Sequence, residues 1–123
     1  MSRKTSAKLL LTGRALDDLA GIVEFSTREW GDRVATRYLD DIEAGIRRLC
    51  ERPGLLEPLA DLPSALKCYA VNKHVIVCDV QGRSIVVLTI IHASMDIPRR
   101  LAELQPSIAA EVVLLHESLR RRR

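Results

Sequence analysis

The stretch SIVVLTIIHASMDIPRRL, residues 84–101, holds the sharpest change of pattern in the 123-residue chain. Its first nine residues are nearly all apolar and rich in β-branched side chains, which is typical of a strand covered on both faces. After His92 the pattern turns helical, because Asp96 can cap a helix and Pro98 falls within its first turn, where a missing N–H costs little. The stretch therefore predicts a central strand that leads directly into a helix.

Two further β-branched runs precede this strand, LKCYAV at 66–71 and HVIVCDV at 74–80. The short polar segments NK and QGR separate the three runs, and connections this short join antiparallel neighbours into a meander. The apolar segment AKLLLT at 7–12 predicts a further strand, which we expect to pair beside the last one and close the sheet. Residues 55–65 carry two prolines and no clear period, and are interpreted as a loop.

Two helical patterns lie between the first strand and the loop. In residues 13–30 apolar side chains recur at the three- and four-residue spacing of one helix face, ending at Trp30, the only tryptophan, which we expect in the core. Asp32 is interpreted as the N-cap of a second helix that continues with the same spacing to Leu49. One helical hairpin packed on one antiparallel sheet is an α+β fold.

The C-terminal residues predict further helix. Pro106 and Ser107 indicate a break, after which residues 108–119 form an apolar stripe that must pack on this domain, on a second copy or on a partner. We therefore divide the chain into one domain at 1–104 and a basic helical extension at 105–123.

The net charge of +3 is confined to the end of the chain. Residues 1–98 hold 13 Lys or Arg and 13 Asp or Glu, whereas residues 99–123 hold 6 and 3. Four arginines occupy positions 120–123. Such a cluster can bind nucleic acid or an acidic partner, or it can be a solvated helix end whose cations suit the helix dipole.

Composition argues against several classes of protein. The apolar runs are far shorter than the ~20 residues of a membrane span, and the N-terminal LLL is too short for a signal peptide, so we expect a cytoplasmic protein with no membrane partner. Cys50, Cys68 and Cys78 show no CxxC and no Cys/His ligand spacing, which favours free thiols over disulfides or zinc. We expect no metal and no cofactor.

In their order and spacing, these elements resemble the RelE/ParE superfamily of toxins from type II toxin–antitoxin modules, and the ParE branch most closely. The segment ALDDLAGIVEFSTREWGDRVATRYLDDIEAGIRRLCERPG, residues 15–54, is similar to the family's helical hairpin in its DL pair, its WG break and its terminal proline. LKCYAVNKHVIVCDV at 66–80 resembles the hairpin of the sheet, and IVVLTIIHASMD at 85–96 the final strand with its histidine and Met-Asp ending. The resemblance spans roughly residues 7–104.

The resemblance implies one of two activities, or a weakly toxic or inert module that only binds its antitoxin. RelE-like members cut mRNA on the ribosome, which needs an acid, a base and cations. The candidates here are Lys67, Lys73, His74 and His92. His74 follows a turn and is expected to be exposed. ParE-like members inhibit DNA gyrase by binding, without catalytic residues. Lys67 and Cys78 stand where an arginine and a tyrosine are common, and LTII at 88–91 lacks the arginine common before the histidine. Gyrase inhibition is therefore the favoured interpretation.

A surface for the target or a partner is predicted at the exit of the last strand, comprising His92, Met95, Asp96, Arg99 and Arg100. The two arginines fall in the first turn of a helix, where the helix dipole disfavours cations, which suggests an acidic partner. His92 can alternatively be structural, with its ring bonded to a backbone carbonyl or to Asp96. The resemblance also implies a hetero-oligomer with a cognate antitoxin, whose disordered or helical tail wraps the helical hairpin and the sheet.

Overall fold

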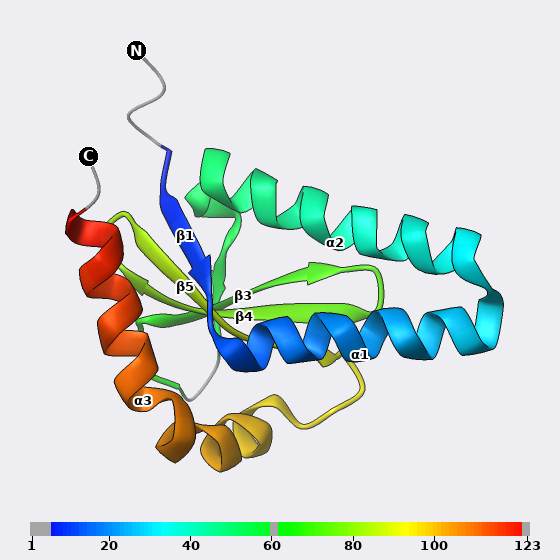
Figure 1. Ribbon diagram of the computed structural model, residues 1–123. Helices are drawn as coiled ribbons and strands as arrows, with labels where there is room; N and C mark the ends of the chain where they lie inside the picture. Colours follow the sequence, from blue (N-terminus) through cyan, green and yellow to red (C-terminus); the bar gives the residue numbers. More distant parts are fainter. Residues whose placement is uncertain (1–5, 60–61, 122–123) are drawn as a thin grey trace.

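The computed structural model describes residues 6–59 and 62–121 of the chain. Within them an N-terminal strand leads into two long helices, then into the remaining strands and a long C-terminal helix (Figure 1). In chain order the elements are β1 (Lys8–Leu11), α1 (Gly13–Trp30), α2 (Asp32–Glu51), the 3₁₀ turn η2 (Pro53–Leu55), β2 (Glu57–Pro58), β3 (Leu66–Val71), β4 (His74–Gln81), β5 (Ser84–His92) and α3 (Ile97–Arg121). No helix of the described residues is long and apolar enough to cross a membrane.

The strands form one five-stranded sheet in the order β1-β5-β4-β3-β2. Strand β1 runs parallel to β5, whereas β3, β4 and β5 pair antiparallel through the two short turns. The predicted meander is therefore confirmed, and so is the pairing of the N-terminal strand beside the last one. Every residue of β5 from Ser84 to Ile91 is buried, as its unbroken apolar run predicted.

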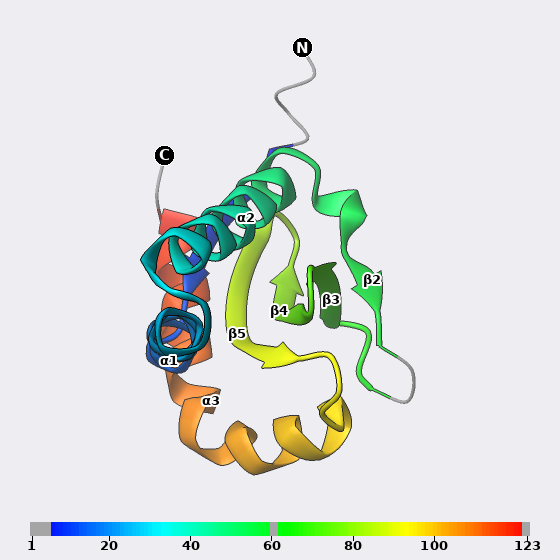
Figure 2. The ribbon, with the colours of Figure 1, turned by 90° about the vertical axis from the view of Figure 1, so that its right-hand side faces the viewer.

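Helices cover both faces of this sheet (Figure 2). On one face the hairpin of α1 and α2 packs on β3, β4 and β5, and the largest buried members of this cluster are Ile42, Leu49, Ile76 and Ile85. On the other face α3 packs on β4 and β5 through Leu101, Leu104, Ile108 and Leu119. The apolar stripe of the C-terminal helix is therefore buried on its own domain.

Two residues set the ends of the helical hairpin. The hydroxyl of Thr12 accepts a hydrogen bond from Ala15 N at 3.0 Å, which caps α1, and it donates to Leu88 O at 2.8 Å, which ties the cap to β5. Gly31 joins the helices with φ of +89°, a conformation that suits glycine alone. The prediction that Asp32 caps α2 is wrong by one residue, because Gly31 occupies the cap position and Asp32 is already helical.

The segment interpreted as a loop contains regular structure. The turn η2, Pro53–Leu55, reaches into it at Leu55, and Glu57–Pro58 form the short edge strand β2, with Glu57 opposite Cys68 of β3. A proline is tolerated there because an edge strand leaves one side of its backbone unpaired. Part of the predicted loop, residues 60–61, lies outside the described residues.

The predicted break at Pro106 is also wrong, because α3 continues from Ile97 to Arg121 with the proline inside it. Proline removes one backbone hydrogen bond and crowds the preceding turn, and α3 is visibly bent (Figure 1). Leu104 and Ile108, on either side of the proline, belong to the same buried cluster, so packing holds the helix together across the bend. The helix crosses position 104, and the division into a domain and an extension stays a prediction.

A buried histidine fastens α3 to the sheet. The side chain of His116 is 1% exposed. Its Nδ1 lies 2.6 Å from the hydroxyl of Ser84 in β5, and its Nε2 lies 2.9 Å from Oδ1 of Asp79 in β4. Both ring nitrogens therefore have partners, as a buried imidazole requires.

A close approach between α2 and β3 gives a test of this packing. A methyl group added at Gly45 would lie 2.6 Å from Cγ2 of Val71, a stiff and buried side chain. We expect Gly45→Ala to lower the free energy of unfolding by about 1–3 kcal/mol, despite the better helix propensity of alanine. The measurement is urea denaturation followed by circular dichroism.

The matched control is Gly21→Ala in α1, because nothing lies within 4 Å of the added methyl group there. This change should raise the free energy of unfolding by roughly 0.5–1 kcal/mol. A Gly45→Ala variant as stable as the wild type would contradict the described packing of α2 on β3.

Candidate functional site

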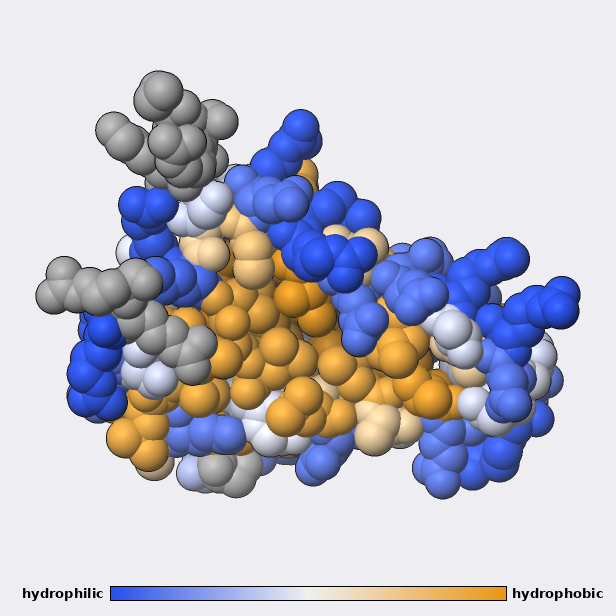
Figure 3. All heavy atoms as spheres, turned by 45° about the horizontal axis from the view of Figure 1, so that its top comes forward, coloured by the Kyte–Doolittle hydropathy of each residue, from blue (hydrophilic) through white to orange (hydrophobic). Residues whose placement is uncertain are grey.

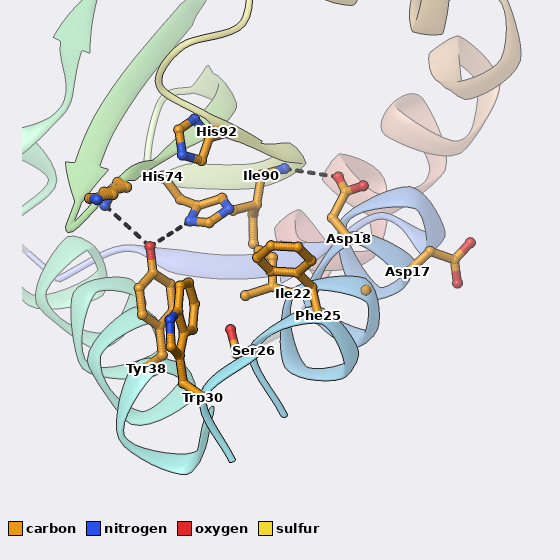
Figure 4. Close-up of a pocket in the computed structure, with 12 residues that line it drawn as sticks. Asp17, Asp18, Ile22, Phe25, Ser26, Trp30, Tyr38, His74, Ile90 and His92 are labelled. Atoms are coloured by element: carbon orange, nitrogen blue, oxygen red, sulfur yellow. Dashed lines mark hydrogen bonds between the residues drawn. The ribbon is translucent and has the colours of Figure 1, made fainter. Parts of the chain in front are cut away.

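A cavity of about 330 Å³ opens between the helical hairpin and the ends of β4 and β5 (Figure 4). Its walls combine apolar side chains of α1 and β5 with the rings of Phe25, Trp30 and Tyr38 and the imidazoles of His74 and His92. The structure therefore brings together three of the four candidates of the nuclease interpretation, Lys73, His74 and His92.

Tyr38 contacts His74 at Nδ1, the ring nitrogen nearer the backbone. The Tyr38 hydroxyl lies 2.6 Å from Nδ1 of His74 and accepts a hydrogen bond from Lys73 N at 3.2 Å. The second ring nitrogen of His74, Nε2, points into the cavity toward Phe25 and Ile90 (Figure 4).

The prediction that His74 is exposed is wrong, because Tyr38 and the neighbouring strand bury about half of it. Burial lowers the pKa of His74 below its ordinary value, and the positive charge that His92 can carry lowers this pKa further. Asp18 acts in the opposite direction, as the smallest of the three effects. The environment thus favours neutral imidazole at His74.

His92 lies directly opposite His74 in the register of β4 and β5. Their rings meet edge to face, with centroids 5.3 Å apart. Nδ1 of His92 accepts a hydrogen bond from Ser94 N at 3.1 Å and lies 2.8 Å from the Ser94 hydroxyl. The structural interpretation of His92 is right about the corner after β5 and wrong about the partner, which is Ser94.

The other predicted site residues lie outside the cavity wall. Lys67 pairs with Cys78, four residues along β3 from the Val71–His74 pair, which is about 13 Å at the rise of a strand. Asp96 caps α3, as predicted, by accepting from Arg99 N at 3.2 Å. Met95 is exposed at the same corner.

The unfavourable position of the two arginines is compensated within α3. Arg100 lies 3.4 Å from Glu103, and Arg99 lies 4.0 Å from the same carboxylate. The helix thus supplies an acidic partner of its own, which weakens the argument that these cations need an external one. The side chain of Arg99 is 80% exposed and remains accessible.

Sequence reasoning missed Asp18, which connects α1 to β5. Its carboxylate accepts from the Thr89 hydroxyl and from Ile90 N, the latter at 3.0 Å, and pairs with Arg14 at 3.2 Å. The expectation of a core position for Trp30 is wrong. Its side chain is 57% exposed at the rim, with its ring edge to face against Phe25. Helical spacing identifies the apolar face of a helix. It does not show whether the sheet still covers that face at the far end of the hairpin.

The described residues offer neither a metal site nor a reactive thiol. Within the described part of the chain, no three or more His, Cys, Asp or Glu side chains are arranged to hold a metal. Burial raises the pKa of all three cysteine thiols, most strongly at Cys78, so the reactive thiolate is disfavoured.

Solved structures from two toxin–antitoxin systems share this architecture. A chain of the chromosomal ParDE system from P. aeruginosa aligns with a TM-score of 0.63 over 73% of this chain and 99% of that chain, at 17% identity. A chain of the RelBE2 toxin–antitoxin complex from Mycobacterium tuberculosis aligns with a TM-score of 0.51 over 71% and 98%, at 14% identity. The fold is therefore that of the RelE/ParE toxins.

Sequence similarity then identifies the family. Toxin ParE of Escherichia coli is 35% identical over 95 residues, which cover 76% of this chain and 92% of the relative. Toxin ParE1 of Caulobacter vibrioides is 30% identical over 86 residues, which cover 70% and 88%. The family model for the ParE toxin of the type II toxin–antitoxin system parDE matches residues 9–97. This chain belongs to the ParE toxin family of type II toxin–antitoxin systems, as its resemblance predicted.

The lowered pKa of His74 makes stability depend on pH. When the pH falls below about 6.5, the unfolded chain binds a proton at this residue before the folded chain does. The contribution of His74 to the free energy of unfolding is therefore complete above that pH. It is lost as the pH falls toward the pKa of His74 in the folded chain. We expect His74→Gln to lose less stability than the wild type between pH 7.5 and pH 5.

The measurement is urea denaturation at both pH values, together with an NMR titration of the imidazole signals. The titration should place the pKa of His74 below that of a histidine in an unfolded peptide. Equal losses of stability in the wild type and His74→Gln would refute the lowered pKa of His74.

Proposed function

We propose that this toxin inhibits DNA gyrase by binding it, without catalysing a reaction, and that a cognate antitoxin holds it inactive in the cytoplasm. The observation that carries the proposal is that the two histidines of the cavity lack the cluster of cations that RNA cleavage needs. Among the described residues that line the cavity, Lys73 alone carries a permanent positive charge. Lys67 is about 13 Å away along β3, and binding to a protein target requires neither group.

The surface proposed to contact gyrase is the corner between β5 and α3, formed by His92, Met95, Asp96, Arg99 and Arg100. Four of its residues are exposed and Arg100 is partly buried, and the surface joins a flexible apolar side chain to two arginines. Methionine and arginine are both enriched in protein–protein interfaces, because they combine apolar contact area with adaptable or bidentate polar contacts. The corner is also braced internally by the Asp96 cap and the Ser94–His92 contact, so its shape is set before binding.

Gyrase inhibition can be tested with purified components. The wild-type toxin should block supercoiling of relaxed plasmid and leave ribosome-bound mRNA intact. The variant Met95→Ala/Arg99→Ala should need about tenfold more toxin for half-inhibition, since a few anchor residues carry most of the energy of an interface. Arg37→Ala, which removes an exposed arginine from α2, is the control and should inhibit like the wild type.

Normal supercoiling at a large molar excess of wild-type toxin would overturn the gyrase proposal. New cleaved ends in mRNA, abolished by His74→Gln or His92→Gln, would favour the endoribonuclease instead.

The proposed antitoxin surface is the outward groove between α1 and α2. A hollow of about 790 Å³ lies there, lined by Leu19, Ala20, Val23 and Leu39, with Asp17, Glu24 and Glu43 among its residues. Figure 3 shows hydrophobic residues gathered in a band on this face, bordered by hydrophilic ones. An antitoxin segment with one apolar helical face and basic residues at its margins would match both features.

A charge placed in this groove should prevent antitoxin binding. Ala20→Glu introduces a carboxylate beside Asp17 and Glu24 at an exposed position, so the folded structure should persist. We expect its affinity for the antitoxin encoded beside it to fall more than tenfold by isothermal titration calorimetry. Thr36→Glu, an exposed position on α2 away from the groove, is the matched control and should bind normally. Equal affinities for both variants would exclude the groove.

A further inference from the structure

A second hollow lies at the opposite end of β4 and β5 from the histidine cavity, about 25 Å away along these strands. Its volume is about 500 Å³. The start of β1, the turn between β4 and β5 and the end of α3 enclose it, and its lining includes Lys8, Gln81, Arg83, Ser84, Leu119 and Arg120. Three separate parts of the chain thus each bring a basic side chain to one concave surface.

Two of these cations are positioned by neutral groups. Arg83 donates from Nε and Nη2 to the carbonyl oxygen of Ser6, at 3.1 and 2.8 Å. Arg120 donates from Nη1 to Oε1 of Gln81 at 3.2 Å. Each guanidinium is therefore oriented without losing its net charge to a carboxylate.

No carboxylate is among the described residues lining this hollow. The acid nearest in the hydrogen-bond network, Asp79, accepts from Gln81 at 3.3 Å and lies 2.9 Å from His116. At the other end of the molecule, in contrast, Arg14, Arg99 and Arg100 all face carboxylates. Arg83 and Arg120 consequently bring positive charge to the hollow that none of the described residues lining it neutralises.

The sequence holds further basic residues next to two of the segments that line the hollow. Arg3 and Lys4 precede Ser6, and Arg121 is followed by Arg122 and Arg123, of which only Arg121 is among the described residues. Cations at the end of a helix can be explained by its dipole. That explanation does not apply to Arg83, which lies in a turn between strands and still joins the same surface.

We infer that this hollow binds the phosphate backbone of duplex DNA. Guanidinium groups match phosphate oxygens in geometry as well as charge. No aromatic side chain is among the described lining residues, so the surface lacks the stacking platform by which single strands are bound. The choice of duplex DNA rests on the proposed function, since gyrase holds duplex DNA close to any inhibitor bound to it. Binding through phosphates carries no sequence preference.

The experiment measures binding of the full chain to a fluorescein-labelled 20-base-pair duplex by fluorescence anisotropy, between 50 and 200 mM salt and without gyrase. Arg83→Gln/Arg120→Gln should weaken binding more than tenfold at 100 mM salt and lower the salt slope by about two, because two phosphate contacts are lost. Arg33→Gln/Arg37→Gln, on the exposed face of α2, removes the same net charge and should change affinity less than twofold. Circular dichroism checks that each variant is folded.

Arg83→Gln also removes the bonds to Ser6, so Arg83→Lys/Arg120→Lys is measured beside it. Retained charge should preserve most of the affinity if phosphates are the ligand. Equal weakening by both glutamine double variants, stronger binding to the single strand, or displacement of the duplex by equimolar polyglutamate would each overturn the inference. Loss of gyrase inhibition with DNA binding intact would overturn the proposed function and leave this site standing.

Discussion

Strand β5 must be hidden from water on both of its faces and along both of its edges, and the rest of the structure meets this requirement. Its eight buried residues lie beside β4 along one edge, β1 pairs with Ser84 to Val87 along the other, and the hairpin and α3 cover its two faces. Two polar side chains interrupt this apolar strand, and each is bonded to a helix. Thr89 donates to Asp18 of α1, and Ser84 pairs with His116 of α3. An unpaired buried hydroxyl would cost about 1–3 kcal/mol, so these two bonds also help to place the helices.

The surfaces proposed for gyrase and for DNA lie at the two ends of β5. At its C-terminal end the strand exits into an exposed corner, and His92 meets His74 at the mouth of a cavity. At its N-terminal end the turn carrying Arg83 meets the end of α3. A strand that is buried along its length can expose functional side chains only at its ends. The two surfaces proposed for gyrase and DNA therefore lie at opposite ends of one rigid element.

Most of the fold could be predicted from the sequence, because helix and strand periods are local properties. The bounds of α1 agree with the helical pattern at 13–30, and the meander and its turns were predicted correctly. The errors have tertiary causes. Residues around Pro106 stay helical because both sides of the bend are buried against one sheet, and Glu57–Pro58 become a strand because β3 offers them an edge. Helix- and strand-breaking residues are local signals, so they carry no information about packing partners far away in the chain.

The candidate site was predictable only in part. His74 and His92 could be brought together by strand pairing, whose register follows from the short turn and the alternation of side chains. The contact of Tyr38 with His74 could not be predicted from the sequence, because the hydroxyl reaches His74 only after α2 has packed on the sheet. The sequence by itself determined most of the elements, their order and the family. Tertiary structure alone decided which histidine is buried, and which of the arginines face carboxylates and which do not. Such contacts join residues far apart in the chain, and packing rather than local pattern sets their distances.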